Sequence, residues 1–273
     1  MAEEAQANTA ERRRWNDEYW ASVWPKREQM TSAVTSILLE RVGLRDGENV
    51  LDIGSGGGIT TIRAGRLVGD RGSAVGADIS AVLVELARRR AKDEAAANVS
   101  FHVSDVQQDT LPGTPFDVAI SQFGVMFFDQ PVTAFANVRR QLRSGGRLGF
   151  ACWQPIEKNP WFVGPALAGY VPTPEPPAPG KSPTGPFSLS DPERVIEILT
   201  RSGWSQVKHD PQELSVEIDR EAIVDDGQLT FLGVPAPSFE AARDAVDQHL
   251  APLQSADGRI HTPLAFEIFS AVA

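Results

Sequence analysis

A glycine-rich segment that follows a short apolar run is the first place in this sequence where chemistry is expected. Val50–Ile53 is apolar except for Asp52, and Gly54, Gly56 and Gly58 follow at alternate positions. Glycine has no Cβ and tolerates positive φ, so a turn built from it lets the backbone approach a ligand closely. The residues after it have the composition of a helix, whose first N–H groups would face the same space. The segment therefore predicts a cofactor-binding turn between a strand and a helix.

The spacing of these glycines argues against a dinucleotide. A dinucleotide-binding turn has the pattern G-x-G-x-x-G or G-x-G-x-x-A, which would place the third small residue at position 59. Ile59 occupies that position, and the glycine lies one place earlier, at Gly58. Taken alone, the turn is also compatible with a plain strand-to-helix connection that binds nothing.

Later segments make the pattern specific. Together with Val50–Gly58, and in the same order, they resemble the motifs of class I S-adenosylmethionine-dependent methyltransferases, in particular the small-molecule enzymes of the ubiquinone and menaquinone biosynthesis type. The resemblance covers about residues 45–153, and the further segments are Ala74–Ser80, Val99–Val106, Phe116–Ser121, Ser121–Phe128 and Val138–Leu148.

The resemblance implies how the first two motifs would hold S-adenosylmethionine. Gly54, Ser55 and Gly56 would bring backbone groups to the methionine part and the ribose. Asp78 would accept hydrogen bonds from the ribose diol, and Ile79 would lie against the adenine face. For Asp78, the alternative is an N-cap of the helix that follows.

The later motifs imply contacts with the adenine and with the transferred methyl group. Asp105 would accept from the exocyclic amine of adenine, and Val106 would donate its backbone N–H to the ring. Ser121 and Gln122 end a strand close to where the methyl group should point. Asp105 is alternatively a turn residue, and we expect Asp52 to orient the glycine turn without touching the cofactor.

No catalytic base is assigned. Methyl transfer depends mainly on alignment of the acceptor and exclusion of water, and a base is needed only if the acceptor must lose a proton. The histidines are His102, His209, His249 and His261. His249 and His261, in the variable region, are candidate bases, although solvated surface positions are the favoured interpretation for both. Cys152 is the sole cysteine, which excludes an intrachain disulfide and a cysteine cluster, and no metal is predicted.

Composition restricts the class of protein. The chain has 273 residues, 41% of them hydrophobic, which favours one domain with elaborations over two full domains. A net charge of −10 argues against nucleic acid as a partner. No stretch of about 20 apolar residues predicts a membrane span, and the polar N-terminal segment does not resemble a secretory signal. We expect a cytoplasmic monomer or homodimer that acts on a small molecule.

The order of elements predicts an α/β fold. Helical patterns at Ile59–Val68, Ala81–Ala97 and Pro131–Leu142 alternate with strand-like runs, which is typical of βαβ units and a mostly parallel sheet. The resemblance implies a Rossmann-like, doubly wound sheet with a terminal antiparallel strand, which we place at Ala265–Ala273. Residues 45–153 would form the cofactor-binding core.

The N-terminal region, residues 1–44, is predicted to be a helical lid. Residues 1 to about 10 look disordered or loosely helical, and Glu11–Val42 has a helical pattern that Pro25 would kink or restart. Its aromatic residues are either a packed helix face or a lid that closes over the cofactor, with Trp20 or Trp24 touching it; they are Trp15, Tyr19, Trp20 and Trp24.

The C-terminal half carries the parts that would choose the acceptor. Residues 154–190 and 219–262 are predicted as elaborations on the substrate side, and the first contains a proline-rich loop at Pro172–Pro186. Between and within them we expect a helix from Asp191 to Arg201, a strand at Gln206–Ile218 and a helix at Phe239–Leu250. Phe127 and Phe128 belong either to the acceptor pocket or to the core.

The sequence thus favours methyl transfer to an O, N or C atom of an apolar or aromatic metabolite. A nicotinamide-dependent oxidoreductase is the alternative enzyme, but neither Tyr19 nor Tyr170 has the setting of a catalytic tyrosine. A non-catalytic S-adenosylmethionine-binding protein is the third possibility, since no base is visible.

Overall fold

A computed structural model describes residues 8–173 and 176–273. The predicted disorder or loose helix of residues 1–7 therefore lies outside the described residues. Within the described ranges, no helix combines the length and the apolar character that crossing a membrane requires.

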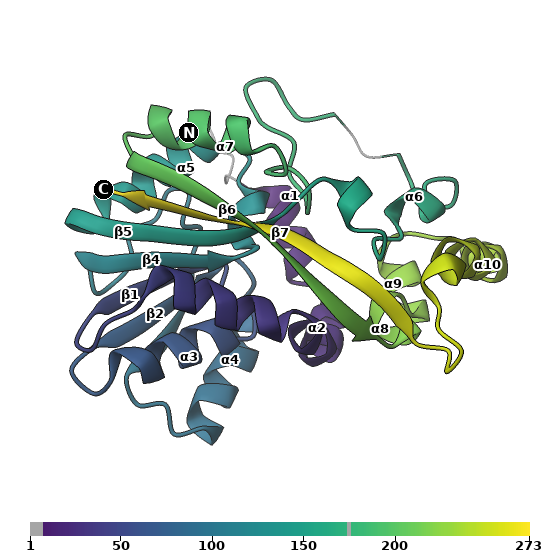
Figure 1. The fold of residues 1–273 in the computed structure, drawn as a ribbon, viewed down its shortest axis with the longest axis horizontal. Coiled ribbons are helices and arrows are strands. Elements are labelled where there is room, and N and C mark those ends of the chain that lie inside the picture. The colour runs from purple at the N-terminus through teal and green to yellow at the C-terminus, as the bar shows by residue number, and fades with distance from the viewer. Residues whose placement is uncertain (1–7, 174–175) are drawn as a thin grey trace, which may run out of the picture.

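The strands form one 7-stranded sheet in the order β3-β2-β1-β4-β5-β7-β6 (Figure 1). Neighbours from β3 to β5 are parallel, and β7 is antiparallel to both β5 and β6. The predicted mostly parallel α/β sheet with a terminal antiparallel strand is confirmed. The bounds are β1 Asn49–Ile53, β2 Ser73–Asp78, β3 Val99–Val103, β4 Phe116–Gln122, β5 Leu142–Trp153, β6 Ser205–Ile218 and β7 Ile260–Val272.

Helices cover both faces of the sheet and one end of it (Figure 1). The longer ones are α1 Thr9–Trp15, α2 Glu18–Val42, α3 Ile59–Val68, α4 Ala81–Asp93, α5 Pro131–Arg140, α7 Pro192–Arg201 and α10 Phe239–Leu250. Short α-helical turns are α6 Gly164–Leu167, α8 Arg220–Ile223 and α9 Asp226–Phe231. The 3₁₀ turns are η1 Gly124–Phe127, η2 Ile156–Lys158, η3 Ala236–Ser238 and η4 Ala251–Leu253.

The central strands are buried on both faces. Val50 of β1 packs in one apolar cluster with Ala64 and Val68 of α3. Its neighbour Leu51 belongs to another cluster, which contains Phe135 of α5. Successive side chains of a strand point to opposite faces, so a strand covered on both sides needs apolar residues in succession. This burial fixes where β1 ends and therefore where the glycine turn begins.

Several predicted elements have the expected bounds because their ends carry clear capping residues. Asp191 caps α7, with its side chain accepting from the N–H of Glu193, and Pro192 occupies the first turn. The helices predicted at Ala81–Ala97 and Pro131–Leu142 end earlier, at Asp93 and Arg140. The last strand begins earlier than predicted, at Ile260.

The prediction of one helix over Glu11–Val42 is wrong. The chain breaks at Asn16, and Asp17 starts α2 by accepting from the N–H of Tyr19. A short acid whose side chain can satisfy a free N–H favours a new helix start over helix continuation. Pro25 neither ends nor restarts α2, because it lies within the helix.

The elaborations gather beyond one end of the sheet, where α6, α8, α9 and α10 lie (Figure 1). The strands β6 and β7 extend toward them, and their pairing continues to Ile218 and Ile260. The described part of the proline-rich loop has neither helix nor strand, as predicted. Residues 260–262, at the end of the second predicted elaboration, belong to β7.

Candidate active site

The glycine turn lies between β1 and α3, and its backbone conformation requires glycine. Gly54, Gly56 and Gly58 have φ values of +68°, +53° and +89°, a region that side chains rarely enter. A Cβ at Gly54 would lie 2.6 Å from the Cα of Gly124, in the turn after β4. The carboxyl ends of β1 and β4 can approach this closely because Gly54 has no side chain.

Asp78, at the end of β2, holds this turn in place. One carboxylate oxygen accepts from the N–H of Gly56 at 2.8 Å, and the other accepts from the N–H of Ser80 at 2.8 Å. Burial raises the pKa of the Asp78 carboxyl group. The alternative prediction of Asp78 as N-cap of the next helix is wrong, since the hydroxyl of Ser80 caps α4 by accepting from the N–H of Leu83.

Asp52 lies beneath the turn and is 1% exposed. It accepts a hydrogen bond from the hydroxyl of Thr61 in α3 at 2.6 Å, while its other oxygen has no partner among the described residues. Burial raises its pKa to about 7. Asp52 therefore links β1 to α3 and does not line the cavities described below, whose lining residues are drawn from the described part of the chain.

A cavity of about 160 Å³ lies at the carboxyl ends of the parallel strands. Its lining includes most of the residues predicted to bind the cofactor: Gly54, Asp78, Ile79, Asp105, Val106 and Gln122. Ligands of open α/β sheets bind at this edge. The fold thus brings together, in one cavity, residues from the ends of strands that are far apart in the sequence.

The remaining predicted residues lie around this cavity in different ways. Ser55 lines a second, adjoining cavity, and its buried hydroxyl has no partner among the described residues. Gly56 is covered by the ring of Trp24, which would lie 2.2 Å from an added Cβ. Among the described lining residues of either cavity, Gly56 and Ser121 do not occur.

Ser121 connects backbone segments. Its hydroxyl donates to the carbonyl of Ile53 at 2.7 Å and accepts from the N–H groups of Gly124 and Val125. The side chain is fully buried. Ser121 thus positions the end of β1 and the turn η1. Because its hydroxyl already bonds to these backbone groups, a direct contact with a ligand must come from a different residue.

Asp105 has a partner that the sequence did not reveal. The side-chain amide of Asn8 donates to both of its carboxylate oxygens, at 3.1 and 3.2 Å, and the N–H of Gln107 donates to one of them. Asn8 precedes α1 and also lines the cavity. The N-terminal segment therefore reaches the group that we predicted to bind the adenine amine.

The second cavity has a volume of about 330 Å³ and a mostly aromatic and aliphatic lining. Its aromatic residues come from α1 and α2, from the turn after β4, from the end of β5 and from both elaborations; they are Trp15, Trp20, Trp24, Phe123, Phe127, Trp153, Trp161, Phe162 and Phe231. The two cavities share Gly54 and Gln122, together with several of these rings. Such a lining suits an apolar or aromatic molecule.

Gln122 occupies the boundary between the cavities. Its side-chain N–H donates to the hydroxyl of Thr31 at 3.2 Å, and its side-chain oxygen is buried with no partner among the described residues. A buried amide oxygen that lacks a partner costs free energy unless a ligand or water donates to it. Gln122 thus offers an acceptor to whatever lies where the cavities meet.

The aromatic residues of the N-terminal region pack against one another and also line the cavities. Trp15 and Trp20 pack against each other with ring centroids 4.5 Å apart, and both line the second cavity. Trp24 covers Gly56 and lines both cavities. Phe127 lines both cavities as well, whereas Phe128 lines the first and packs against the core residue Phe135.

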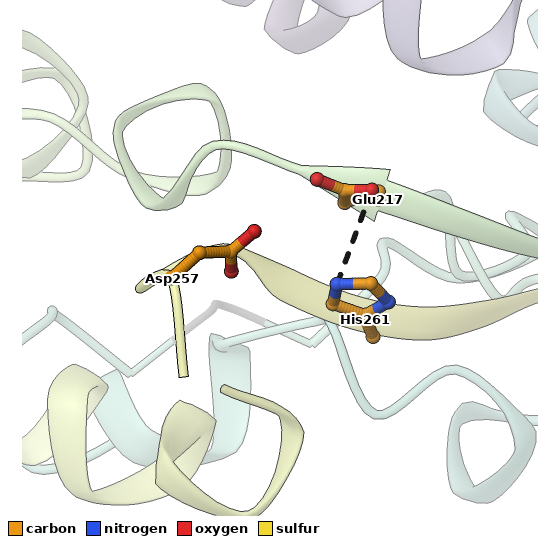
Figure 2. Close-up of side chains that lie close together, drawn as sticks. All are labelled: Glu217, Asp257 and His261. Carbon is orange, nitrogen blue, oxygen red and sulfur yellow. Dashed lines mark ion pairs between the residues drawn. The ribbon is translucent and has the colours of Figure 1, made fainter. Parts of the chain in front are cut away.

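The histidines, all of which the structure describes, lie outside the lining of both cavities. His261 comes together with Glu217 and Asp257 in a group whose composition would suit a metal ion (Figure 2). These side chains are exposed, and Glu217 forms an ion pair with Arg259, which competes with any cation. The group lies at the end of the β6–β7 pair, and none of its residues lines either cavity.

The comparisons with known proteins agree with this geometry. Residues 50–146 match the sequence model of the family described as "Methyltransferase domain". Over 104 residues the chain is 36% identical to aklanonic acid methyltransferase DauC from Streptomyces sp. strain C5, covering 38% of this chain and 47% of that protein. This region therefore matches a methyltransferase domain.

Two further comparisons show how much of the chain is similar to other proteins. The chain is 36% identical over 111 residues to the ubiquinone/menaquinone biosynthesis C-methyltransferase UbiE of Azotobacter vinelandii, covering 40% of this chain and 44% of that protein. It therefore aligns with slightly less than half the length of these curated relatives. The YcgJ protein of Bacillus subtilis has the same fold, with a TM-score of 0.61 at 17% identity over 88% of this chain and 98% of that one.

The matched region contains all of the predicted cofactor-binding residues, but several residues that sequence reasoning missed lie outside it. Asn8, Arg27 and Gln228 reach the cavities from segments outside residues 50–146. Trp153 and Trp161 also lie outside that range and line the second cavity. For Trp153 and Trp161, the only feature of the sequence that could have indicated this role is the clustering of tryptophans in the segments that flank the matched region.

Proposed function

We propose that this protein transfers a methyl group from S-adenosylmethionine to a small apolar or aromatic acceptor. The observation that carries the proposal is the pair of adjoining cavities that share Gln122 at the end of β4. The first cavity has polar groups suited to a nucleoside, and the second is lined mainly by rings. A shared boundary is what a direct transfer between two bound molecules needs.

The polar groups of the first cavity fit S-adenosylmethionine. The carboxylates of Asp78 and Asp105 would accept from the ribose diol and the adenine amine, with Ile79 against the adenine ring. The unpartnered hydroxyl of Ser55 is available to the methionine end. When bound, S-adenosylmethionine supplies a methyl group activated by a sulfonium.

The chain's own contribution to catalysis is alignment and exclusion of water. Trp24 and Phe127 lie between the cavities, and their rings would hold a flat acceptor while displacing solvent. Among the described residues, the one carboxylate in the lining of the second cavity is Glu28, which forms an ion pair with Arg90 at 2.7 Å. This lining favours an acceptor that is itself nucleophilic, including an electron-rich carbon, as the name of the C-methyltransferase UbiE indicates for that relative.

We further propose the division of the chain stated above: a lid at 1–44, a cofactor-binding core at 45–153 and substrate-side elaborations at 154–190 and 219–262. A cytoplasmic location, a monomeric or homodimeric state and the absence of a nucleic-acid partner stay predictions.

Calorimetric titration with S-adenosylmethionine, S-adenosylhomocysteine and NAD tests the proposal. We expect binding of the first two and none of NAD. Binding of NAD alone would identify an oxidoreductase. Binding of both methionine-derived ligands without methyl transfer to a panel of aromatic acceptors would identify a non-catalytic binding protein.

A further inference from the structure

Arg27 of α2 lines the mainly apolar second cavity without a carboxylate partner. Its guanidinium donates to the side-chain oxygen of Gln228 at 2.9 Å and lies over the ring of Trp20, 5.0 Å from the centroid. Among the described residues, no acid lies within ion-pair distance of Arg27. A cation held at the wall of an apolar cavity by a neutral amide and a ring retains donors for a ligand.

The polar contacts of Arg27 are Tyr19 and Gln228, and the nearby carboxylate of Asp225 bonds to both of these residues without pairing directly with Arg27. Tyr19 stays neutral, because burial raises its pKa to about 12. Its hydroxyl donates to Asp225 at 3.3 Å, and Asp225 also accepts from the N–H of Gln228. These bonds engage Asp225 in holding α9, which presents Gln228 to Arg27.

The other charged residues of the lining leave the cavity positive. Glu28 is paired with Arg90 at 2.7 Å and also accepts from the indole N–H of Trp24. Arg14 reaches Glu11 only at 4.0 Å. The protein as a whole carries a net charge of −10, so this excess of positive charge is local to the cavity.

We propose that the acceptor is an aromatic molecule with a carboxylate, and that Arg27 binds this carboxylate. A guanidinium matches a carboxylate with parallel hydrogen bonds, and such a pair is strong where water is excluded. The rings of the cavity take the aromatic part, so the cation fixes its orientation. The inference rests on the proposed role of the second cavity as the acceptor site.

A pair of isosteric probes tests this assignment. We would titrate 2-naphthoate and 2-naphthamide, which share a ring system and differ in charge, into the full chain with and without saturating S-adenosylhomocysteine. The wild-type protein should bind 2-naphthoate about tenfold more tightly than 2-naphthamide, as expected for one charge-assisted contact. Arg27→Gln should remove this difference and leave the affinity for 2-naphthamide within about threefold.

Two further variants make the result specific. Lys26→Gln removes the same charge from the adjacent, exposed position, which lies outside the cavity lining, and should keep the preference for 2-naphthoate. Arg27→Lys keeps the charge but loses the paired donors, so its affinity should be intermediate. Equal binding of both probes to the wild type, no binding of 2-naphthoate, or an unchanged preference in Arg27→Gln would overturn the assignment.

If the methyltransferase proposal is wrong, the same titrations should give a different result. In that case S-adenosylhomocysteine would not bind, while a preference for 2-naphthoate that depends on Arg27 would persist. Normal binding of S-adenosylhomocysteine with no such preference would instead refute the role of Arg27 alone.

Discussion

The carboxylate of Asp78 accepts a hydrogen bond from the backbone N–H of Gly56 at 2.8 Å, which joins the end of β2 to the glycine turn after β1. The same side chain lines the first cavity. One carboxylate therefore holds the turn and faces the space where a nucleoside would bind.

Asp78→Asn should weaken the binding of S-adenosylhomocysteine about tenfold or more. An amide has one acceptor oxygen, so it cannot serve Gly56, Ser80 and a ribose diol together, and a hydrogen bond to a charged group contributes about 1.5–3 kcal/mol. Titration calorimetry measures the effect. Asp93→Asn removes a charge from an exposed position on α4 and should leave the affinity unchanged. An unaltered affinity in Asp78→Asn would refute the assigned contact.

Gly54→Ala should destabilise the fold more than Gly145→Ala. Both glycines have positive φ, +68° and +73°, but an added Cβ meets the backbone of Gly124 at the first position and nothing within 4 Å at the second. We expect a loss of about 1 kcal/mol from φ strain in Gly145→Ala, and about 3 kcal/mol when overlap is added in Gly54→Ala. Urea unfolding of both variants measures the difference. Equal losses of stability would show that the backbone of Gly124 can move away from the added Cβ at little cost in free energy.

Asp52→Asn should change how stability depends on pH. The folded pKa of Asp52 is about 7, above that of an unfolded aspartate near 4. Between these values the unfolded chain has lost the proton while the folded protein keeps it, so stability falls as pH rises through this window. The variant cannot titrate here, so the free energy of unfolding of the wild type should decline relative to the variant from about pH 4 to about pH 7. Parallel curves would mean that Asp52 ionises normally.

Asn8→Ala should increase the affinity for S-adenosylhomocysteine about tenfold or more. The amide of Asn8 occupies the carboxylate of Asp105, and a ligand that binds there must displace this hydrogen bond to a charged group, which contributes about 1.5–3 kcal/mol. Asn16→Ala loosens the same N-terminal segment without opening Asp105, because Asn16 bonds to the backbone near the start of α4. A gain in both variants would assign the effect to the segment as a whole, and a loss in Asn8→Ala would mean that Asn8 contacts the ligand.

Local signals were enough to predict the elements of the core and the cofactor edge. The turn at Gly54 and the helix capped by Asp191 depend on residues close together in the sequence, so their patterns are informative. Because Asp78 was predicted to end a strand, the sequence correctly indicated that it lies beside a cavity. The same reasoning failed to show that the hydroxyl of Ser121 turns to the backbone of Ile53, since side-chain direction depends on packing.

The contacts that the sequence could not reveal join distant segments. Asn8 meets Asp105, and Arg27 meets Gln228, across large separations in the chain. The short helices α8 and α9 are too brief for a helical period to appear, and contacts with α2 accompany them. Tertiary packing determines these parts, so single-sequence patterns carry little information about them.

The pairing of Ile218 with Ile260 closes the base of the loop formed by residues 219–259. Its ends are adjacent in a buried position of the hairpin, yet the loop supplies Ile223, Gln228 and Phe231 to the second cavity. Evolution can therefore exchange this insert as a unit, in length and in sequence, without altering the strands that hold the nucleoside side. New acceptor preferences can arise on an inherited cofactor site by replacement of one closed loop.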